Sequence, residues 1–138
     1  MPVVTKAVDV VASGGLTITE YFGNVSTNNA NLSACLATVT EACADAYQAP
    51  DFDEYVMVIS GELHLYKSDE EKTVIKAGEA VFLAAKERVK WVWPGPCQYI
   101  PICLPSFTPA NCNREAEGDE VKTPEAMARL NALHEDKK

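Results

Sequence analysis

Short runs of β-forming residues, separated by Gly and Pro turns, fill the chain from residue 3 to about residue 104. Turn signals recur about every 8–12 residues, a spacing that is typical of sandwiches and barrels. The runs are Val3–Val11, Leu16–Phe22, Leu32–Thr40, Glu54–Ser60, Glu62–Tyr66, Thr73–Lys76, Ala80–Ala84, Val89–Trp93 and Gln98–Leu104. Strands joined by such short turns pair in antiparallel fashion, because parallel pairs need long crossovers. We therefore expect an all-β antiparallel sandwich or small barrel, and periodicity alone does not choose between the two.

The C-terminal segment has helical periodicity instead. Thr123-Pro124-Glu125 supplies a capping hydroxyl, a proline at the first helical position and an acid in the first turn. Three apolar residues then fall on one face at helical spacing: Met127, Leu130 and Leu133. The pattern predicts a helix over about 124–134. Because a helix this short is not stable alone, we expect it to dock on the sheet or on a second subunit.

Length and charge restrict the class of protein. The 138 residues fit one compact domain, and 12 basic against 20 acidic side chains give a net charge of −8. Such a balance argues against nucleic acid or an anionic membrane as a partner, since phosphate binding needs clustered Lys and Arg. The sequence has no apolar run of the roughly 18 residues that a membrane span requires, and no signal-peptide pattern at its start. We expect a cytoplasmic protein.

The cysteine pattern favours reduced thiols. The five cysteines are an odd number without CxxC spacing, at positions 35, 43, 97, 103 and 112. They are typical of core thiols in a reducing compartment rather than of a disulfide framework or a zinc site.

The spacing of one Glu and two Gly residues matches the two motifs of the cupins. Glu54 and Gly61 have the Glu-to-Gly spacing of the first motif, and Gly78 stands at the start of the second. The histidines of both motifs are replaced. Gln48 and Pro50 stand where the paired histidines would be, and Val89 stands where the last one would be.

The chain departs from the cupin motifs at the metal ligands and at one turn. Of the four usual cupin metal ligands only Glu54 remains, so we expect no metal and no other cofactor. The Pro-x-Gly corner of the second motif reads Ala84-Ala85-Lys86.

Within the cupins, the chain most closely resembles the EutQ-like family of ethanolamine utilisation. The matching pieces are Phe52-Asp53-Glu54, Gly61-Glu62-Leu63-His64, Lys76-Ala77-Gly78-Glu79 and, more loosely, Pro109-Ala110-Asn111. The resemblance implies a single cupin domain over residues 1–138, with an antiparallel jelly-roll barrel over about 3–112 and a short C-terminal α-helix outside it. It also implies a homodimer and a pocket inside the barrel mouth. Acetate kinase activity has been attributed to the family, but this sequence lacks a Gly-rich phosphate loop.

Glu54 is the candidate catalytic residue. In the cupin arrangement its side chain points into the barrel, where burial disfavours the charged form and raises the pKa of a carboxyl group. A carboxyl poised in this way is suited to general acid or base chemistry near pH 7. The alternative is a buried glutamate that is hydrogen-bonded for structure alone.

Candidate substrate-binding residues follow from strand alternation. If position 89 faces inward, Trp91 and Trp93 face inward too, and they either form the wall of a ligand site or fill the core. Gln48 offers a neutral hydrogen-bonding group where metal chemistry would use His. Tyr99 lies on the last strand and is compatible with either face.

The function predicted from the sequence is that of a small cupin that binds a small organic molecule in its barrel. Acid–base catalysis of an isomerase, dehydratase or lyase type, without a metal, is the leading interpretation. The first alternative is a metal-dependent cupin enzyme with non-standard ligands. The second is a non-catalytic accessory or assembly protein related to ethanolamine utilisation.

Overall fold

Ten strands and one helix are formed by the residues that this computed structural model describes, 2–115 and 124–135. Their bounds are β1 (Val8–Ser13), β2 (Leu16–Phe22), β3 (Ser33–Val39), β4 (Cys43–Ala44), β5 (Asp53–Ser60), β6 (Glu62–Ser68), β7 (Glu71–Lys76), β8 (Ala80–Leu83), β9 (Lys90–Trp93), β10 (Cys97–Leu104) and α1 (Pro124–Glu135).

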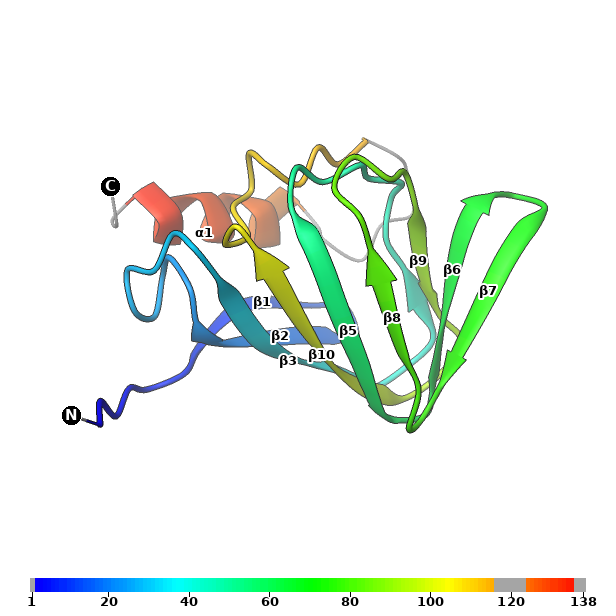
Figure 1. The fold of residues 1–138 in the computed structure, drawn as a ribbon, viewed down its shortest axis with the longest axis horizontal. Coiled ribbons are helices and arrows are strands. Elements are labelled where there is room, and N and C mark those ends of the chain that lie inside the picture. The colour runs from blue at the N-terminus through cyan, green and yellow to red at the C-terminus, as the bar shows by residue number, and fades with distance from the viewer. Residues whose placement is uncertain (1, 116–123, 136–138) are drawn as a thin grey trace.

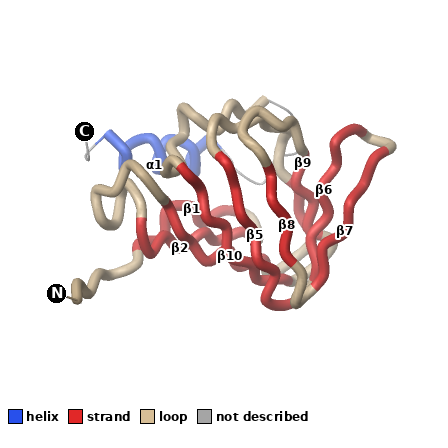
Figure 2. Tube along the Cα trace, viewed as in Figure 1, coloured by secondary structure: helices blue, strands red, loops and turns tan. Residues whose placement is uncertain are grey.

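The strands form two antiparallel sheets that enclose the core. The larger sheet has the order β1-β2-β3-β10-β5-β8, and the smaller has the order β4-β9-β6-β7. In Figure 1 the β6–β7 hairpin lies at one end of the molecule and α1 at the other, above β1 and β2. Figure 2 shows that loops gather along the edge where β5, β8 and β9 meet their connections. This edge is the mouth of the barrel.

The all-β antiparallel prediction is confirmed, and most strands lie within two residues of their predicted bounds. Two differences occur. Residues 3–7 are outside any strand, since β1 begins at Val8, and the two-residue strand β4 was not predicted. The first run was extended too far because Val3 and Val4 have high β propensity but remain exposed and have no strand beside them.

The predicted C-terminal helix is present and packs against β1. Leu130 is fully buried, and Met127 and Leu133 contact the core as the helical spacing predicted. The predicted cap, Thr123, lies outside the described residues. Among residues 2–115 and 124–135, no helix combines the length and the apolar character that crossing a bilayer requires.

Gly61 turns the chain from one sheet into the other. It joins β5 of the larger sheet to β6 of the smaller, and its φ of 70° is in the left-handed region. A Cβ atom built on it would lie 2.7 Å from the Cβ of Cys97 and closer still to the carbonyl oxygen of Pro96. Only a residue without a side chain fits this corner.

We predict that Gly61→Ala destabilises the fold by about 2–4 kcal/mol, because a left-handed backbone and a backbone clash both oppose the methyl group. Gly78→Ala is the matched control. Gly78 also has a positive φ of 86°, but nothing lies within 4 Å of the place that its methyl group would take. Its substitution should cost only about 1 kcal/mol. Urea denaturation measures both values, and equal losses would show that the close approach at Gly61 is unimportant.

Candidate functional site

A cavity of about 70 Å³ lies between the two sheets, near the mouth of the barrel. At the roughly 30 Å³ that a water molecule occupies in the liquid, this volume corresponds to about two waters, so only a compact ligand fits. Its wall contains all five residues that the sequence singled out: Gln48, Glu54, Trp91, Trp93 and Tyr99. The structure thus brings these residues together, while the roles assigned to them remain predictions.

Strand alternation places the aromatic residues in this wall. Trp91 and Trp93 occupy the inward positions of β9, and Tyr99 occupies an inward position of β10. Their rings are nearly parallel, at interplanar angles of 17–24°, with centroids 5.6–6.4 Å apart. Three stacked aromatic side chains therefore form one continuous apolar surface, within the distances at which such rings attract one another.

The two indole N–H groups are buried without acceptors. Neither Trp91 Nε1 nor Trp93 Nε1 has a hydrogen-bond partner among the described residues. Trp93 is close to the Tyr99 phenol, where it slightly offsets the rise in the pKa of that group, but it does not reach hydrogen-bond geometry. Two unpaired donors in one wall are unusual, because most buried polar groups in folded proteins are paired.

Glu54 is on β5, and the residue is 8% exposed. It pairs in register with Cys103 of β10. Burial, and next the Glu54 carboxylate, raise the pKa of the Cys103 thiol well above its usual value. The same two causes, in the same order, raise the pKa of the Tyr99 phenol. The carboxyl group therefore acts electrostatically on both neighbours from within the cavity wall.

Gln48 is held at the mouth by its backbone and its side chain. Its backbone pairs with Val89 on one side and with Arg114 on the other. Its side-chain oxygen accepts a hydrogen bond from the Cys112 thiol, with Sγ and Oε1 2.9 Å apart. These contacts connect the loop before β5, the loop before β9 and the segment after β10.

Asp45 is a second carboxyl group in the cavity wall, and sequence reasoning missed it. It is buried, and its Oδ1 accepts hydrogen bonds from the Ala46 backbone N–H at 2.9 Å and from Arg114 Nε at 2.8 Å. Arg114 Nη2 is 2.7 Å from the same oxygen. The pair balances charge at the mouth, since a buried carboxylate without a cation would be strongly unfavourable. Neither residue lies in a periodic segment, so no sequence pattern marked them.

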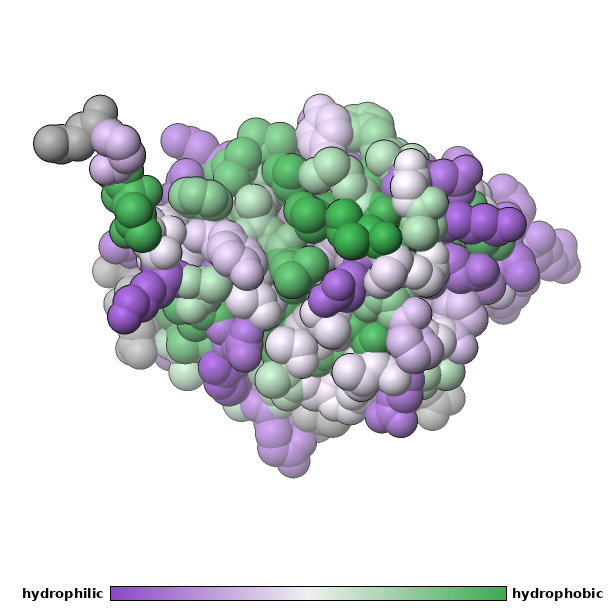
Figure 3. All heavy atoms as spheres, turned by 90° about the horizontal axis from the view of Figure 1, so that it is seen from below, coloured by the Kyte–Doolittle hydropathy of each residue, from purple (hydrophilic) through white to green (hydrophobic). Residues whose placement is uncertain are grey.

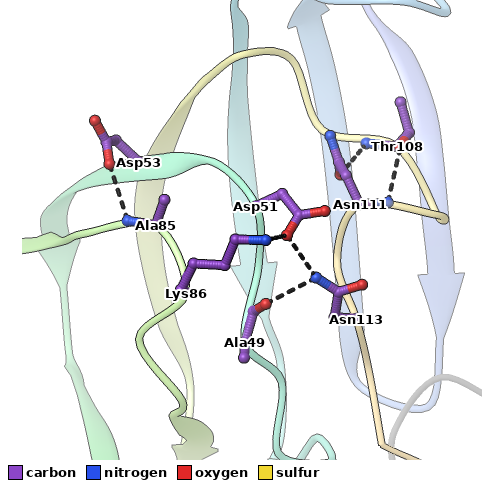
Figure 4. Close-up of polar contacts among 8 residues, drawn as sticks. All are labelled: Ala49, Asp51, Asp53, Ala85, Lys86, Thr108, Asn111 and Asn113. Atoms are coloured by element: carbon purple, nitrogen blue, oxygen red, sulfur yellow. Dashed lines mark hydrogen bonds and ion pairs between the residues drawn. The ribbon is translucent and has the colours of Figure 1, made fainter.

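A polar network ties the same loops together on the outer side of the mouth (Figure 4). Asp51 accepts hydrogen bonds from the Lys86 ammonium and from Asn113 Nδ2, and Asn113 also donates to the Ala49 carbonyl. The Lys86 ammonium and Asn113 hold the pKa of the exposed Asp51 carboxyl below its usual value. Lys86 has a φ of 74°, so the corner that lacks the cupin glycine still requires a left-handed residue.

Comparison with known proteins shows which fold this architecture shares. Residues 33–94 match the EutQ-like cupin domain family. An RmlC-like cupin from Shewanella frigidimarina superposes with a TM-score of 0.59 at 22% identity, over 74% of this chain and 85% of that one. The EutQ protein of Clostridium difficile superposes with a TM-score of 0.54 at 18% identity, over 66% of this chain and 63% of that one. The protein has the cupin jelly-roll fold. The resemblance to EutQ-like cupins that the sequence indicated is confirmed.

Two further similarities are to proteins whose names differ from those of the cupins above. A variant of Streptomyces PAC13, solved with uridine, superposes with a TM-score of 0.64 at 14% identity, over 87% of this chain and 91% of that one. The sequence is also 28% identical over 110 residues to a Myxococcus xanthus protein named endoribonuclease YbeY. That match covers 78% of this chain but only 37% of the relative, so the chain spans about a third of that protein's length.

The residues present do not fit the metal that cupin barrels commonly hold. Of the three positions at which the motifs have histidine, Val89 and Pro50 carry no side-chain donor, and the Gln48 oxygen is engaged by Cys112. Within the described ranges, no three His, Cys, Asp or Glu side chains are grouped so that they could hold a metal ion. At the motif positions one carboxylate and one amide remain, which is a weak set for Zn, Fe or Mn, and the second carboxyl group of the wall, Asp45, is already paired with Arg114.

The cavity thiols generate a prediction about alkaline pH. Burial, followed by the Glu20 and Glu54 carboxylates, raises the pKa of the Cys35 thiol from 9.0 to about 12. The pKa of this thiol is higher in the folded state than in the unfolded state. The protonated Cys35 thiol therefore contributes fully to the free energy of unfolding below pH 9, and this contribution is lost as the pH rises towards 12.

We expect the free energy of unfolding to decrease above pH 9, and to decrease by about 2 kcal/mol less in Cys35→Ala than in the wild type by about pH 10.5. Denaturant unfolding at a series of pH values measures the two slopes. Parallel curves for the two proteins would show that Cys35 is not a buried thiol in solution.

Proposed function

We propose that this cupin binds a small organic molecule in its barrel cavity and that Glu54 exchanges a proton with it. The observation that carries this proposal is the shared cavity of Glu54 and the stacked rings of Trp91, Trp93 and Tyr99. A ligand site of this kind is typically apolar, with a few convergent polar groups. A carboxyl group in such surroundings is a suitable general acid or base.

The reaction classes that fit are isomerisation, dehydration and lyase-type elimination. Each of them needs a proton moved at a carbon atom of the substrate, and one carboxyl group can both take and return it. The RNA chemistry in the name of the Myxococcus relative is not carried over, because the match covers only 37% of that protein. A net charge of −8 also disfavours RNA as a substrate.

The tryptophans provide a direct assay of ligand binding. The sequence has two, and both line the cavity. The two indole N–H resonances of ¹⁵N-labelled protein therefore report on this site. In a screen of small metabolites, a compound that binds in the cavity shifts both indole N–H resonances, whereas a compound that binds to the surface leaves them unchanged.

For such a ligand, Glu54→Gln should keep binding and fold, because the swap is nearly isosteric, and should slow proton exchange at the ligand by about 10²–10⁴-fold. Exchange in D₂O followed by NMR measures the rate, and thermal unfolding measures stability. Glu71→Gln, on the exposed face of β7, is the matched control and should change neither. A destabilised Glu54→Gln variant with full exchange activity would identify Glu54 as a structural acid.

The outer face of the larger sheet supports a second proposal, that of a homodimer. Tyr55, Met57 and Ile59 project outward from β5 and Phe82 from β8, each 42–52% exposed. Tyr55 and Phe82 pair in register, with ring centroids 4.9 Å apart. In Figure 3 apolar residues gather over the upper middle of the face that is drawn, with white and purple residues among and around them.

A second copy of the chain is the occupant that this face fits best. The four side chains expose on the order of 400 Å², which equals the largest apolar patches of ordinary monomers, patches that are often functional, and is about half of what one partner contributes to a standard interface. An uncharged face offers no charge for a partner of opposite sign to recognise, and it meets its own copy without repulsion.

We predict that the wild type is dimeric at micromolar concentration and that Ile59→Lys makes it monomeric, because two copies of the charge would be buried in the interface. Sedimentation velocity measures the mass. Lys72→Glu on β7, away from this face, is the control and should remain dimeric. A monomeric wild type would contradict the proposal.

A further inference from the structure

The charged groups of the cavity wall restrict what the cavity can bind. Glu54 and Asp45 are both in the wall, whereas no Lys, Arg or His side chain lines the cavity in the described part of the chain. The cation nearest to Asp45 is Arg114, which is already bound to it and is not in the wall. An anionic ligand in the cavity would lie beside the Glu54 carboxyl group, and no described Lys, Arg or His of the wall would contact the ligand, which is unfavourable at low dielectric. The wall therefore selects against carboxylates and phosphates.

The hydrogen-bond donors of the wall indicate which polar group the ligand carries. The indole N–H groups of Trp91 and Trp93 are buried without acceptors among the described residues. Burial and the Glu54 carboxylate raise the pKa of the Tyr99 phenol, so it keeps its proton and remains a donor at neutral pH. A ligand with an acceptor oxygen would satisfy donors that the described residues leave unpaired.

The strand register leaves space for a ligand between the acid and these donors. Tyr99 pairs with Val58, which is four residues beyond Glu54 on β5. Four residues of strand span about 13 Å, so the backbones of Glu54 and Tyr99 are well separated along the barrel. Both side chains nevertheless line the same cavity. A compact molecule between them has a carboxyl group on one side and O–H and N–H donors on the other.

We propose that the ligand is a small uncharged carbonyl compound, with a C–H bond next to its carbonyl facing Glu54 and its carbonyl oxygen facing Tyr99 and an indole N–H. This inference rests on the proposed acid–base function and adds the substrate class to it. The same division of labour, a carboxylate base opposite neutral donors in an apolar site, is a general solution for forming an enolate near neutral pH.

Every proton and electron pair is accounted for in the proposed enolisation step. The Glu54 carboxylate takes the proton from the carbon, the electrons of the C–H bond form the new C=C bond, and the carbonyl π electrons move to oxygen. Tyr99 and an indole N–H stabilise the oxyanion by hydrogen bonds. Protonated Glu54 then returns the proton to the same carbon or to a neighbouring one. No oxidant, reductant or metal enters the step, and in D₂O the returned hydron is a deuteron.

The first test compares two probes of equal size and different charge. Hydroxyacetone and glycolate have the same number of non-hydrogen atoms, and a carboxylate oxygen replaces the methyl group in glycolate. We expect hydroxyacetone to shift both indole N–H resonances and glycolate to bind at least tenfold more weakly. Glycolate binding at the indoles as tightly as hydroxyacetone would overturn the proposal.

The second test measures deuterium exchange at the carbons next to the carbonyl of hydroxyacetone. Tyr99→Phe removes only the hydroxyl group and should slow exchange by about 10²–10³-fold, since it removes a donor to the oxyanion. Tyr21→Phe, on the exposed side of β2, is the control and should exchange like the wild type. Trp91→Phe keeps an aromatic ring, removes the N–H, and gives an independent measure if the Tyr99 variant is poorly folded. Wild-type exchange in both cavity variants would overturn the assignment of the donors.

The two levels of the proposal fail in different ways. If hydroxyacetone leaves the indole resonances unchanged while a carboxylate moves them and Glu54→Gln abolishes its proton exchange, the substrate class is wrong and the acid–base function stands. If no compound of any charge moves the indole resonances, the proposed function fails together with the substrate class.

Discussion

The pairing of β5 with β10 is the constraint on which the site depends. In this register Glu54 lies opposite Cys103 and Tyr99 opposite Val58, and all four residues face the interior. Because side chains alternate between the two faces of a strand, a slip of one residue would turn Glu54 to the solvent and bring Tyr55 inside. The sharp corner at Gly61 and the irregularity between Gln98 and Tyr99 hold that register in place.

The mouth of the barrel keeps a polar construction although the cupin histidines are absent. Backbone pairing of Gln48 with Val89 and Arg114, together with the buried contact between Arg114 and Asp45, connects three loops above the cavity. The result is a cavity whose wall combines a carboxyl group with aromatic rings and with indole donors that have no acceptor among the described residues, rather than with a metal-binding ligand set. Such surroundings favour proton transfer with an uncharged molecule.

The sequence could predict the parts of this arrangement that follow from periodicity. Alternation from Val89 predicted that Trp91 and Trp93 face inward, and the structure places them there. It could not decide the side of Tyr99, because the outward positions of β10, among them Ile100 and Ile102, are apolar as well. The contact between Asp45 and Arg114 was not predictable either. It joins a residue beside a two-residue strand to one in an irregular segment, and neither position has a period.

The most direct test of the account is a pH titration of the two indole N–H resonances in the wild type and in Glu54→Gln. If Glu54 holds a titratable proton beside the aromatic wall, both indole resonances should shift as that carboxyl group changes charge. The shift should be absent in the Gln variant. Indole resonances that titrate identically in the two proteins, or not at all, would contradict the claim that Glu54 is the working acid of this cavity.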